Sequence, residues 1–155
     1  MPLTGGGAVT SDLDFAKEFS KRVHAGQVDK AGEEYWKHPA AVADLCSTDE
    51  EKIVAYLHDT VEDTDTTIDM IEKMFGSRIA VAVNYITHPQ GMPYMDYIKR
   101  LAENDIAVRV KQADLRHNMD LSRLPAVTER DITRARKYQE AYSFLNKLEN
   151  SGKRW

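Results

Sequence analysis

Four short patterns of the type Ser/Thr-x-x-Asp/Glu occur along the sequence, each directly before apolar residues at helical spacing. They are Ser11-x-x-Asp14, Ser47-x-x-Glu50, Thr66-x-x-Asp69 and Thr128-x-x-Asp131. In such a capping box, the hydroxyl oxygen accepts a hydrogen bond from a backbone N–H that the first turn of a helix cannot satisfy. No stretch shows the sustained apolar–polar alternation of a half-buried strand. The sequence therefore predicts an all-α fold.

The apolar periodicity places these helices along the chain. Helices are expected after Ser11, from His38-Pro39, after Ser47, after Thr66, from Ser77, from Pro93, from Asp105 and after Thr128. The polar segment 25–37, which contains two glycines, and the turn 88–91 are expected to be irregular. We expect one helical domain over residues 11–150, between a flexible, glycine-rich tail at 1–10 and a frayed end at 151–155.

Composition narrows the setting in which this domain works. The chain has 155 residues, of which 42% are hydrophobic, and this is enough for one core. Its net charge of −4 gives no electrostatic case for binding nucleic acid or an anionic membrane. The one cysteine, Cys46, excludes an internal disulfide and fits a reducing, cytoplasmic setting. No apolar run approaches the roughly 18 residues of a membrane span. The sequence does not determine whether the chain forms oligomers.

One short stretch, residues 57–63, concentrates groups suited to metal chemistry. If it is helical, a rotation of 100° per residue brings His58, Asp59, Glu62 and Asp63 within an arc of about 140°. An adjacent imidazole and carboxylate offer a divalent cation one nitrogen and one oxygen from a single turn. The second carboxylate pair offers a base for a water molecule. The same residues also fit a polar helix end facing solvent, so a metal site requires further ligands.

Two residues elsewhere in the chain are candidates for those ligands. His38 stands at the start of a short apolar helix, where a fixed imidazole could project into the core. Asp114 lies on or near an apolar helix face, where an unpaired carboxylate would be costly. A metal shared with His38 and the His58-Asp59 pair would satisfy Asp114. A salt bridge to Lys111, or hydrogen bonds from a helix N-terminus, would satisfy it as well.

The order His38, then His58-Asp59, then Asp114 resembles the H…HD…D pattern of the HD superfamily of metal-dependent phosphohydrolases. Three longer motifs extend the resemblance to the RelA/SpoT-type alarmone hydrolase domain and its small stand-alone relatives. Residues 24–39 resemble H-x-G-Q-x-R-K-x-G-x-P-Y-x-x-H-P, residues 57–64 match L-H-D-T-V-E-D-T, and residues 111–119 match K-x-A-D-x-x-x-N-M. The resemblance covers residues 12–125.

This resemblance implies a compact helical bundle with a metal site in its core, and it implies a role for particular residues. The metal ligands would be His38, His58, Asp59 and Asp114, with Mn²⁺ as the typical ion and another divalent metal as the alternative. The catalytic pair that activates or orients water would be Glu62 and Asp63. The contacts to a nucleotide substrate would be Lys30, Lys111 and Asn118. The reaction would be metal-assisted hydrolysis of a phosphate or pyrophosphate ester.

Two departures from the family pattern fall on the substrate side. Asp29 stands where the alarmone hydrolases have arginine, and Glu34 stands where they have proline. Asp29 reverses the charge and offers no bidentate phosphate contact. The leading hypothesis is hydrolysis of the 3′-pyrophosphate of guanosine 3′,5′-bis(diphosphate), and the alternative is hydrolysis of another nucleotide or dinucleotide phosphate. A metal- or nucleotide-binding module with low turnover, and a purely structural helical protein, complete the set of hypotheses.

Overall fold

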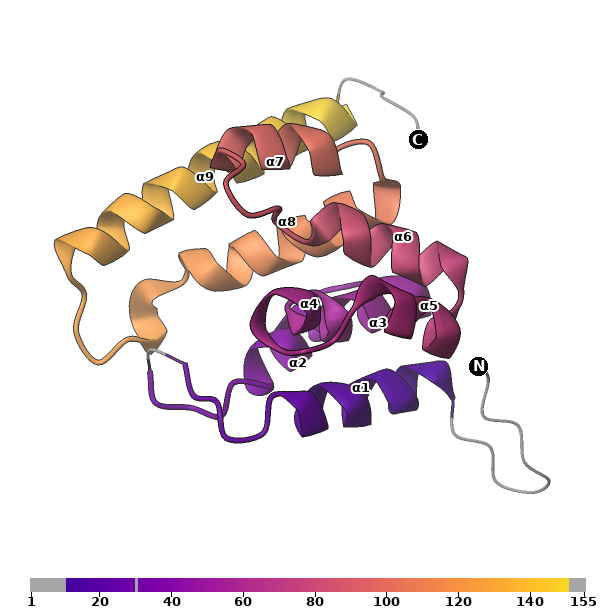
Figure 1. Ribbon diagram of the computed structural model, residues 1–155. Helices are drawn as coiled ribbons and strands as arrows, with labels where there is room; N and C mark the ends of the chain where they lie inside the picture. The colour runs from indigo at the N-terminus through magenta and orange to yellow at the C-terminus, as the bar shows by residue number, and fades with distance from the viewer. Residues whose placement is uncertain (1–10, 30, 151–155) are drawn as a thin grey trace.

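The computed structural model describes residues 11–29 and 31–150, and Figure 1 shows that they are arranged as packed helices. The expected tail at 1–10 and the expected frayed end at 151–155 lie outside the described residues. Within this part of the chain, the β structure is limited to one isolated antiparallel bridge between Val28 and Glu34. The all-α prediction is confirmed.

The helices begin close to the expected positions. In chain order they are α1 Asp12–Val23, α2 Lys37–Asp44, α3 Asp49–Leu57, α4 Thr60–Asp63, α5 Ile68–Phe75, α6 Ser77–Ile86, α7 Tyr94–Leu101, α8 Asp105–Met119, the short 3-10 helix η1 Leu121–Arg123, and α9 Glu129–Asn150. Pro39 is the third residue of α2 rather than the first, because the helix already begins at Lys37. Gly76 ends α5 with φ 94°, a backbone angle that other residues rarely adopt.

Helix α8 is the centre of the molecule. It packs against α2, α3, α6 and α9, while α1 covers α3 from the outside (Figure 1). Neighbours on several sides explain why Val108 and Val110 are both fully buried while Arg109 between them is exposed. The buried apolar residues of α8 are Ile106, Ala107, Val108, Val110, Ala113 and Leu115. Any polar group on the inner faces of α8 is therefore held in the core.

Two of the four predicted caps are confirmed and two are wrong by one residue. Ser11 Oγ accepts from Asp14 N at 3.1 Å, and Thr128 and Asp131 bond each other's backbone N–H reciprocally. The caps of α3 and α5 are Thr48 and Thr67, not Ser47 and Thr66. At α3, Thr48 accepts from Glu51 N, while the Glu51 carboxylate accepts from the N–H of Ser47.

The stretch 57–63 is not one continuous helix. Helix α3 ends at Leu57, and His58 and Asp59 form the turn before α4. Two polar side chains form hydrogen bonds with backbone carbonyl groups at this point. His58 Nδ1 lies 2.6 Å from Ala55 O, and Thr60 Oγ1 donates to Leu57 O at 2.8 Å. The condition of one regular helix over residues 58–63 is therefore not met, although His58 and Asp59 keep right-handed helical backbone angles. The turn aims His58 into the core, where it is 3% exposed.

In the described part of the chain, no helix combines the length and the apolar character that crossing a membrane requires.

The corrected cap of α3 can be tested by its stability contribution. Thr48→Ala should lower the free energy of unfolding by about 1 kcal/mol, because it removes the acceptor for Glu51 N. Ser47→Ala, the neighbouring change on the same loop, should be nearly neutral because its hydroxyl does not cap α3. Urea unfolding followed by circular dichroism measures both. Equal losses for the two variants would contradict this assignment.

Candidate metal centre and active site

Four side chains from three separate parts of the chain converge beside α8. Asp114 Oδ1 lies 2.8 Å from His38 Nε2 and 3.2 Å from His58 Nε2. Asp59 Oδ2 lies 3.3 Å from His58 Nε2 and 3.9 Å from His38 Nε2. The ligand atoms of the two histidines and Asp114 all lie within 4.8 Å of one another. The fold therefore brings together all four residues predicted as metal ligands.

The turn after α3 presets the orientation of the His58 ring. A carbonyl oxygen can only accept, so Nδ1 carries the hydrogen that bonds Ala55 O at 2.6 Å. Nε2 then faces the carboxylates of Asp59 and Asp114. Burial lowers the pKa of His58, but the two carboxylates outweigh it and raise the pKa to about 9. In the metal-free protein, a proton on Nε2 gives the His58 ring a positive charge, which stabilises the two nearby carboxylates.

The second imidazole, His38, is held in place by His117. Their Nδ1 atoms lie 2.7 Å apart. In the tautomer where His38 Nδ1–H donates to His117, Nε2 of His38 keeps a lone pair for a cation. His117 was not predicted to take part in the site. The sequence feature that could have identified His117 is its position three residues after Asp114 on the same helix. This spacing places both side chains on the face that meets α2.

Asp114 is almost fully buried, at 4% exposure, and is satisfied from several directions. Its Oδ2 accepts from Lys111 Nζ at 3.0 Å, and its Oδ1 accepts from Asn118 Nδ2 at 3.1 Å. Burial raises the pKa of Asp114, but Lys111, His58 and His38 outweigh it, so the pKa lies well below its usual range. The salt bridge to Lys111 that the sequence left open is present, and it leaves Oδ1 facing the histidines.

Tyr35 ties the metal-side carboxylates to the loop before α2. Its hydroxyl lies 2.8 Å from Asp59 Oδ2 and 3.1 Å from Asp63 Oδ2, and one O–H can donate fully to only one of them. Burial and then Asp59 raise the pKa of Tyr35, so its proton stays in place. Burial and then Asp59 also raise the pKa of Asp63. Tyr35 belongs to the motif at residues 24–39, but only the fold shows what its hydroxyl contacts.

Glu62 extends from α4 toward the cavity, where the turn after α6 holds it. The backbone N–H of His88 donates to Glu62 Oε2 at 3.2 Å. The His88 ring is fixed in turn by stacking on Tyr97, at 4.5 Å between ring centres, and by a bond between Nε2 and Met92 O at 2.6 Å. Burial raises the pKa of Glu62, and the N–H of His88 partly offsets this. Glu62 lines the cavity, whereas Asp63 does not.

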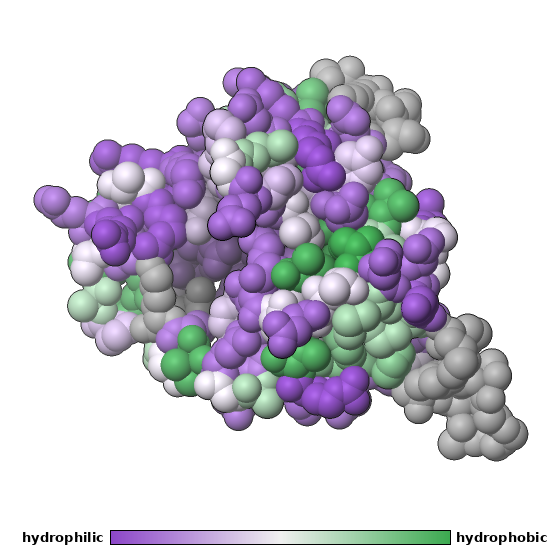
Figure 2. Space-filling view, viewed as in Figure 1, coloured by the Kyte–Doolittle hydropathy of each residue, from purple (hydrophilic) through white to green (hydrophobic). Residues whose placement is uncertain are grey.

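The cavity beside the four converging residues has a volume of about 650 Å³, enough for a nucleotide. Figure 2 shows the molecule hollowed and hydrophilic on its left side, next to the N-terminal half of α9. Lys111 and Asn118, two of the predicted substrate contacts, line this cavity, together with Tyr94, Tyr97, Arg134, Lys137 and Tyr138. The third predicted contact, Lys30, lies outside the described residues.

Asp29 lines the cavity but uses its carboxylate to shape its own loop. Its Oδ1 accepts from the backbone N–H groups of Ala31 at 2.8 Å and Glu33 at 3.0 Å. Short polar side chains favour such local bonds in turns. An arginine at this position would lose both contacts. The departure from the family pattern at Asp29 therefore changes how the loop is built as well as its charge.

The donor set suits a divalent cation. Two imidazole nitrogens and two carboxylate oxygens form a mixed set that Mn²⁺, Zn²⁺ and Fe²⁺ all accept, so the set by itself does not select among them. Both imidazoles carry a second bond at Nδ1 that leaves Nε2 facing the carboxylates, as metal-binding histidines do. The residues present therefore fit a metal.

Several known proteins are similar to this chain in sequence. A guanosine-3′,5′-bis(diphosphate) 3′-pyrophosphohydrolase from Homo sapiens, MESH1, is 36% identical over 133 residues, which are 76% of this chain and 73% of that protein. The protein of the same function from Aquifex aeolicus is 36% identical over 120 residues, covering 70% of this chain and 17% of the relative. The chain spans less than a fifth of the length of the long bacterial relatives that it matches.

A solved structure and a family model also match this chain. A metazoan orthologue of SpoT that hydrolyses ppGpp has a fold similar to this one, with a TM-score of 0.74 at 20% identity, covering 90% of this chain and 88% of the other. Residues 16–123 match the HD domain family, and this match spans both histidines, both aspartates and the helices that carry them. The chain therefore belongs to the HD domain family.

Proposed function

We propose that this chain is a metal-dependent phosphohydrolase that removes the 3′-pyrophosphate of guanosine 3′,5′-bis(diphosphate). The convergence of His38, His58, Asp59 and Asp114 beside a cavity lined by Glu62 carries this proposal. The relatives named as hydrolases of that compound, one of them matched over 73% of its length, support the choice of substrate.

His38, His58, Asp59 and Asp114 would hold the divalent cation, with Mn²⁺ as the proposed ion. When bound, such a cation polarises a phosphoryl oxygen and makes an attacking water more acidic. The protein's part is to keep both Nε2 atoms and both carboxylates aimed at one point. The bonds of Ala55 O, His117, Tyr35 and Lys111 do this before any ligand arrives.

Glu62 would accept the proton of the attacking water. Its carboxylate lines the cavity, and its raised pKa makes it a better base than an ordinary exposed glutamate. The water oxygen bonds to phosphorus, the bond from phosphorus to the ribose 3′ oxygen breaks, and the proton on Glu62 is available to that leaving oxygen. The products are guanosine 5′-diphosphate and pyrophosphate.

Asp63 would act on the site through Tyr35 rather than on the water itself. It lies outside the cavity lining, and its Oδ2 shares the Tyr35 hydroxyl with Asp59. This shared hydrogen fixes Asp59 relative to α4, which also carries Glu62. We therefore propose that Asp63 is a positioning residue, and that Lys111 and Asn118 contact the substrate where they line the cavity.

A second candidate is hydrolysis of another nucleotide phosphate by the same centre. Asp29 favours it, because its carboxylate occupies a place on the cavity wall where the alarmone hydrolases have a cationic guanidinium. Incubation with a panel of nucleotides bearing 2′-, 3′- or 5′-phosphates, in the presence of Mn²⁺, separates the two candidates. Pyrophosphate release from guanosine 3′,5′-bis(diphosphate) supports the first. Monophosphate release from other nucleotides alone supports the second.

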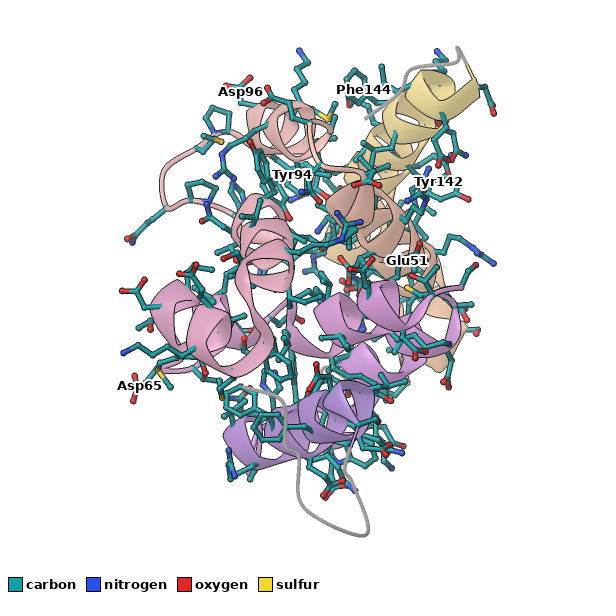
Figure 3. All side chains as sticks on the ribbon, turned by 90° about the vertical axis from the view of Figure 1, so that its right-hand side faces the viewer. Glu51, Asp65, Tyr94, Asp96, Tyr142 and Phe144 are labelled. Carbon is teal, nitrogen blue, oxygen red and sulfur yellow. The ribbon has the colours of Figure 1, made fainter. Side chains whose placement is uncertain are left out.

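Removal of a ligand should abolish metal binding. Purified protein should contain close to one divalent ion per chain, and His58→Ala and Asp114→Ala should lose it, because each removes an atom at the shared point. Asp65→Asn is the matched control, since Figure 3 shows Asp65 at the edge of the molecule, pointing outward. Elemental analysis of the folded variants measures the content. Full metal content in both ligand variants would argue against the site.

Metal affinity should rise with pH. Because the raised pKa of His58 is about 9, a proton occupies Nε2 at neutral pH and the metal must displace it. This proton stabilises the metal-free fold fully below about pH 6.5, and its contribution is lost as pH rises through about 9. The affinity for Mn²⁺ should therefore increase up to about tenfold per pH unit between about pH 6.5 and 8.5, by calorimetric titration. A flat profile would show that no such proton is displaced.

Loss of the proposed base should remove turnover and spare metal binding. Glu62→Gln keeps the shape of the side chain and should lower kcat by roughly 10²- to 10⁴-fold. Its metal content should match that of the wild type, because Glu62 is not among the converging ligands. Asp65→Asn serves again as the control and should stay within about twofold. Retention of wild-type kcat in Glu62→Gln would exclude Glu62 as the base.

A further inference from the structure

The cavity has a wall that the metal chemistry does not use. Helices α7 and α9 form it, and they contribute Tyr94, Lys137 and Tyr138. In Figure 3, Tyr94 lies beneath α7, on the side facing the middle of the molecule. This wall lies outside the quoted sequence motifs, because Tyr94 falls between the motifs at 57–64 and 111–119 and α9 follows residue 125, where the resemblance ends.

Lys137 carries a charge that no carboxylate neutralises within the described residues. The other two cations on the cavity wall are paired: Lys111 with Asp114 at 3.0 Å, and Arg134 with Asp131 at 3.5 Å. Lys137 instead rests over aromatic rings, with its Nζ 4.5 Å from the ring centre of Tyr94 and 5.7 Å from that of Tyr138. The rings position the ammonium group without cancelling its charge.

Tyr94 presents a hydroxyl that lacks a partner in the part of the chain that the structure describes. This oxygen is buried, and no hydrogen bond reaches it. Buried hydroxyl groups almost always find a partner in proteins, so the hydroxyl of this cavity-lining residue is available to donate to a bound ligand. The Tyr94 ring also links the two lysines, since Lys111 Nζ lies 6.0 Å from its centre and Lys137 Nζ lies 4.5 Å from it.

The charge of the cavity makes this wall important for an anionic substrate. Six carboxylates line the cavity against the three cations named above; they are Asp29, Asp59, Glu62, Asp114, Asp120 and Asp131. A divalent cation would offset the acidic end where Asp59 and Asp114 lie. A polyphosphate that extends beyond that end meets carboxylates unless a free cation receives it, and Lys137 is placed to do so.

We propose that Tyr94 and Lys137 bind a second phosphate group of the substrate, one that is not cleaved. The doubly phosphorylated nucleotide of the proposed function would then bind with one phosphorylated end at the metal and the other at the α7–α9 wall. This inference rests on the proposed function, and it makes Tyr94 and Lys137 specificity-determining residues of the same site. Within the proposed reaction, the second group is the 5′-diphosphate.

Steady-state kinetics with two matched substrates tests this proposal. The first is guanosine 3′,5′-bis(diphosphate), and the second is guanosine 3′-diphosphate with a free 5′-hydroxyl. Lys137→Met should raise KM for the first by about tenfold or more, the effect of losing a charged hydrogen bond, and leave KM for the second within about twofold. Tyr94→Phe should act in the same direction with a smaller increase. Lys147→Met is the control, because this exposed lysine of α9 does not line the cavity.

The outcomes separate this proposal from the proposed function on which it rests. Selective loss for the doubly phosphorylated substrate in Lys137→Met, with unchanged Lys147→Met, supports the proposal. Equal effects on both substrates, or no effect on either, overturn it while wild-type turnover leaves the proposed function intact. A wild-type protein that hydrolyses neither compound overturns the proposed function and this proposal with it. Thermal unfolding of each variant confirms that it is folded.

Discussion

The buried carboxylate of Asp114 sets the conditions that the surrounding structure has to meet. It lies on the central helix α8 and is 4% exposed, so its charge must be matched by groups in the core. Lys111 neutralises one oxygen, and the two imidazoles approach the other. Removing one partner of such a buried pair typically costs about 3–5 kcal/mol, which makes the arrangement of α2, α3 and α8 around this carboxylate a matter of stability as well as chemistry.

A second level of contacts turns this cluster into an oriented site. His117 and the carbonyl of Ala55 hold His38 and His58 at their Nδ1 atoms, away from the carboxylates. The hydroxyl of Tyr35 holds Asp59 at Oδ2, the oxygen that also faces the two imidazoles. The turn at His58 matters here, because Ala55 O at the end of α3 accepts from the His58 ring as well as from the His58 backbone N–H. The same turn starts α4, so the proposed base Glu62 and the proposed ligand Asp59 are carried by one short segment.

The helices, and the four proposed ligands that the fold brings together, could be predicted from the sequence because both signals are local or ordered along the chain. The sequence-based prediction misplaced two caps, since Ser47-Thr48 and Thr66-Thr67 each offer two adjacent hydroxyl groups, and only packing decides which of them meets the N–H of the first turn. It also missed the break at His58-Asp59, where side chains compete for carbonyls. The roles of His117 and Tyr35 depend on contacts 79 and 24 residues apart, which no motif encodes. The wall of Tyr94 and Lys137 likewise exists only once α7 and α9 are packed together.

The position of the metal tests most directly whether the four converging side chains form one site. Crystals grown with Mn²⁺ and measured near the manganese absorption edge would show the ion by its anomalous scattering. The geometry predicts one strong peak at about 2.0–2.3 Å from Nε2 of His38, Nε2 of His58 and a carboxylate oxygen of both Asp59 and Asp114. A peak elsewhere in the molecule, or none between these four residues at saturating Mn²⁺, would contradict the metal centre on which the proposed hydrolysis depends.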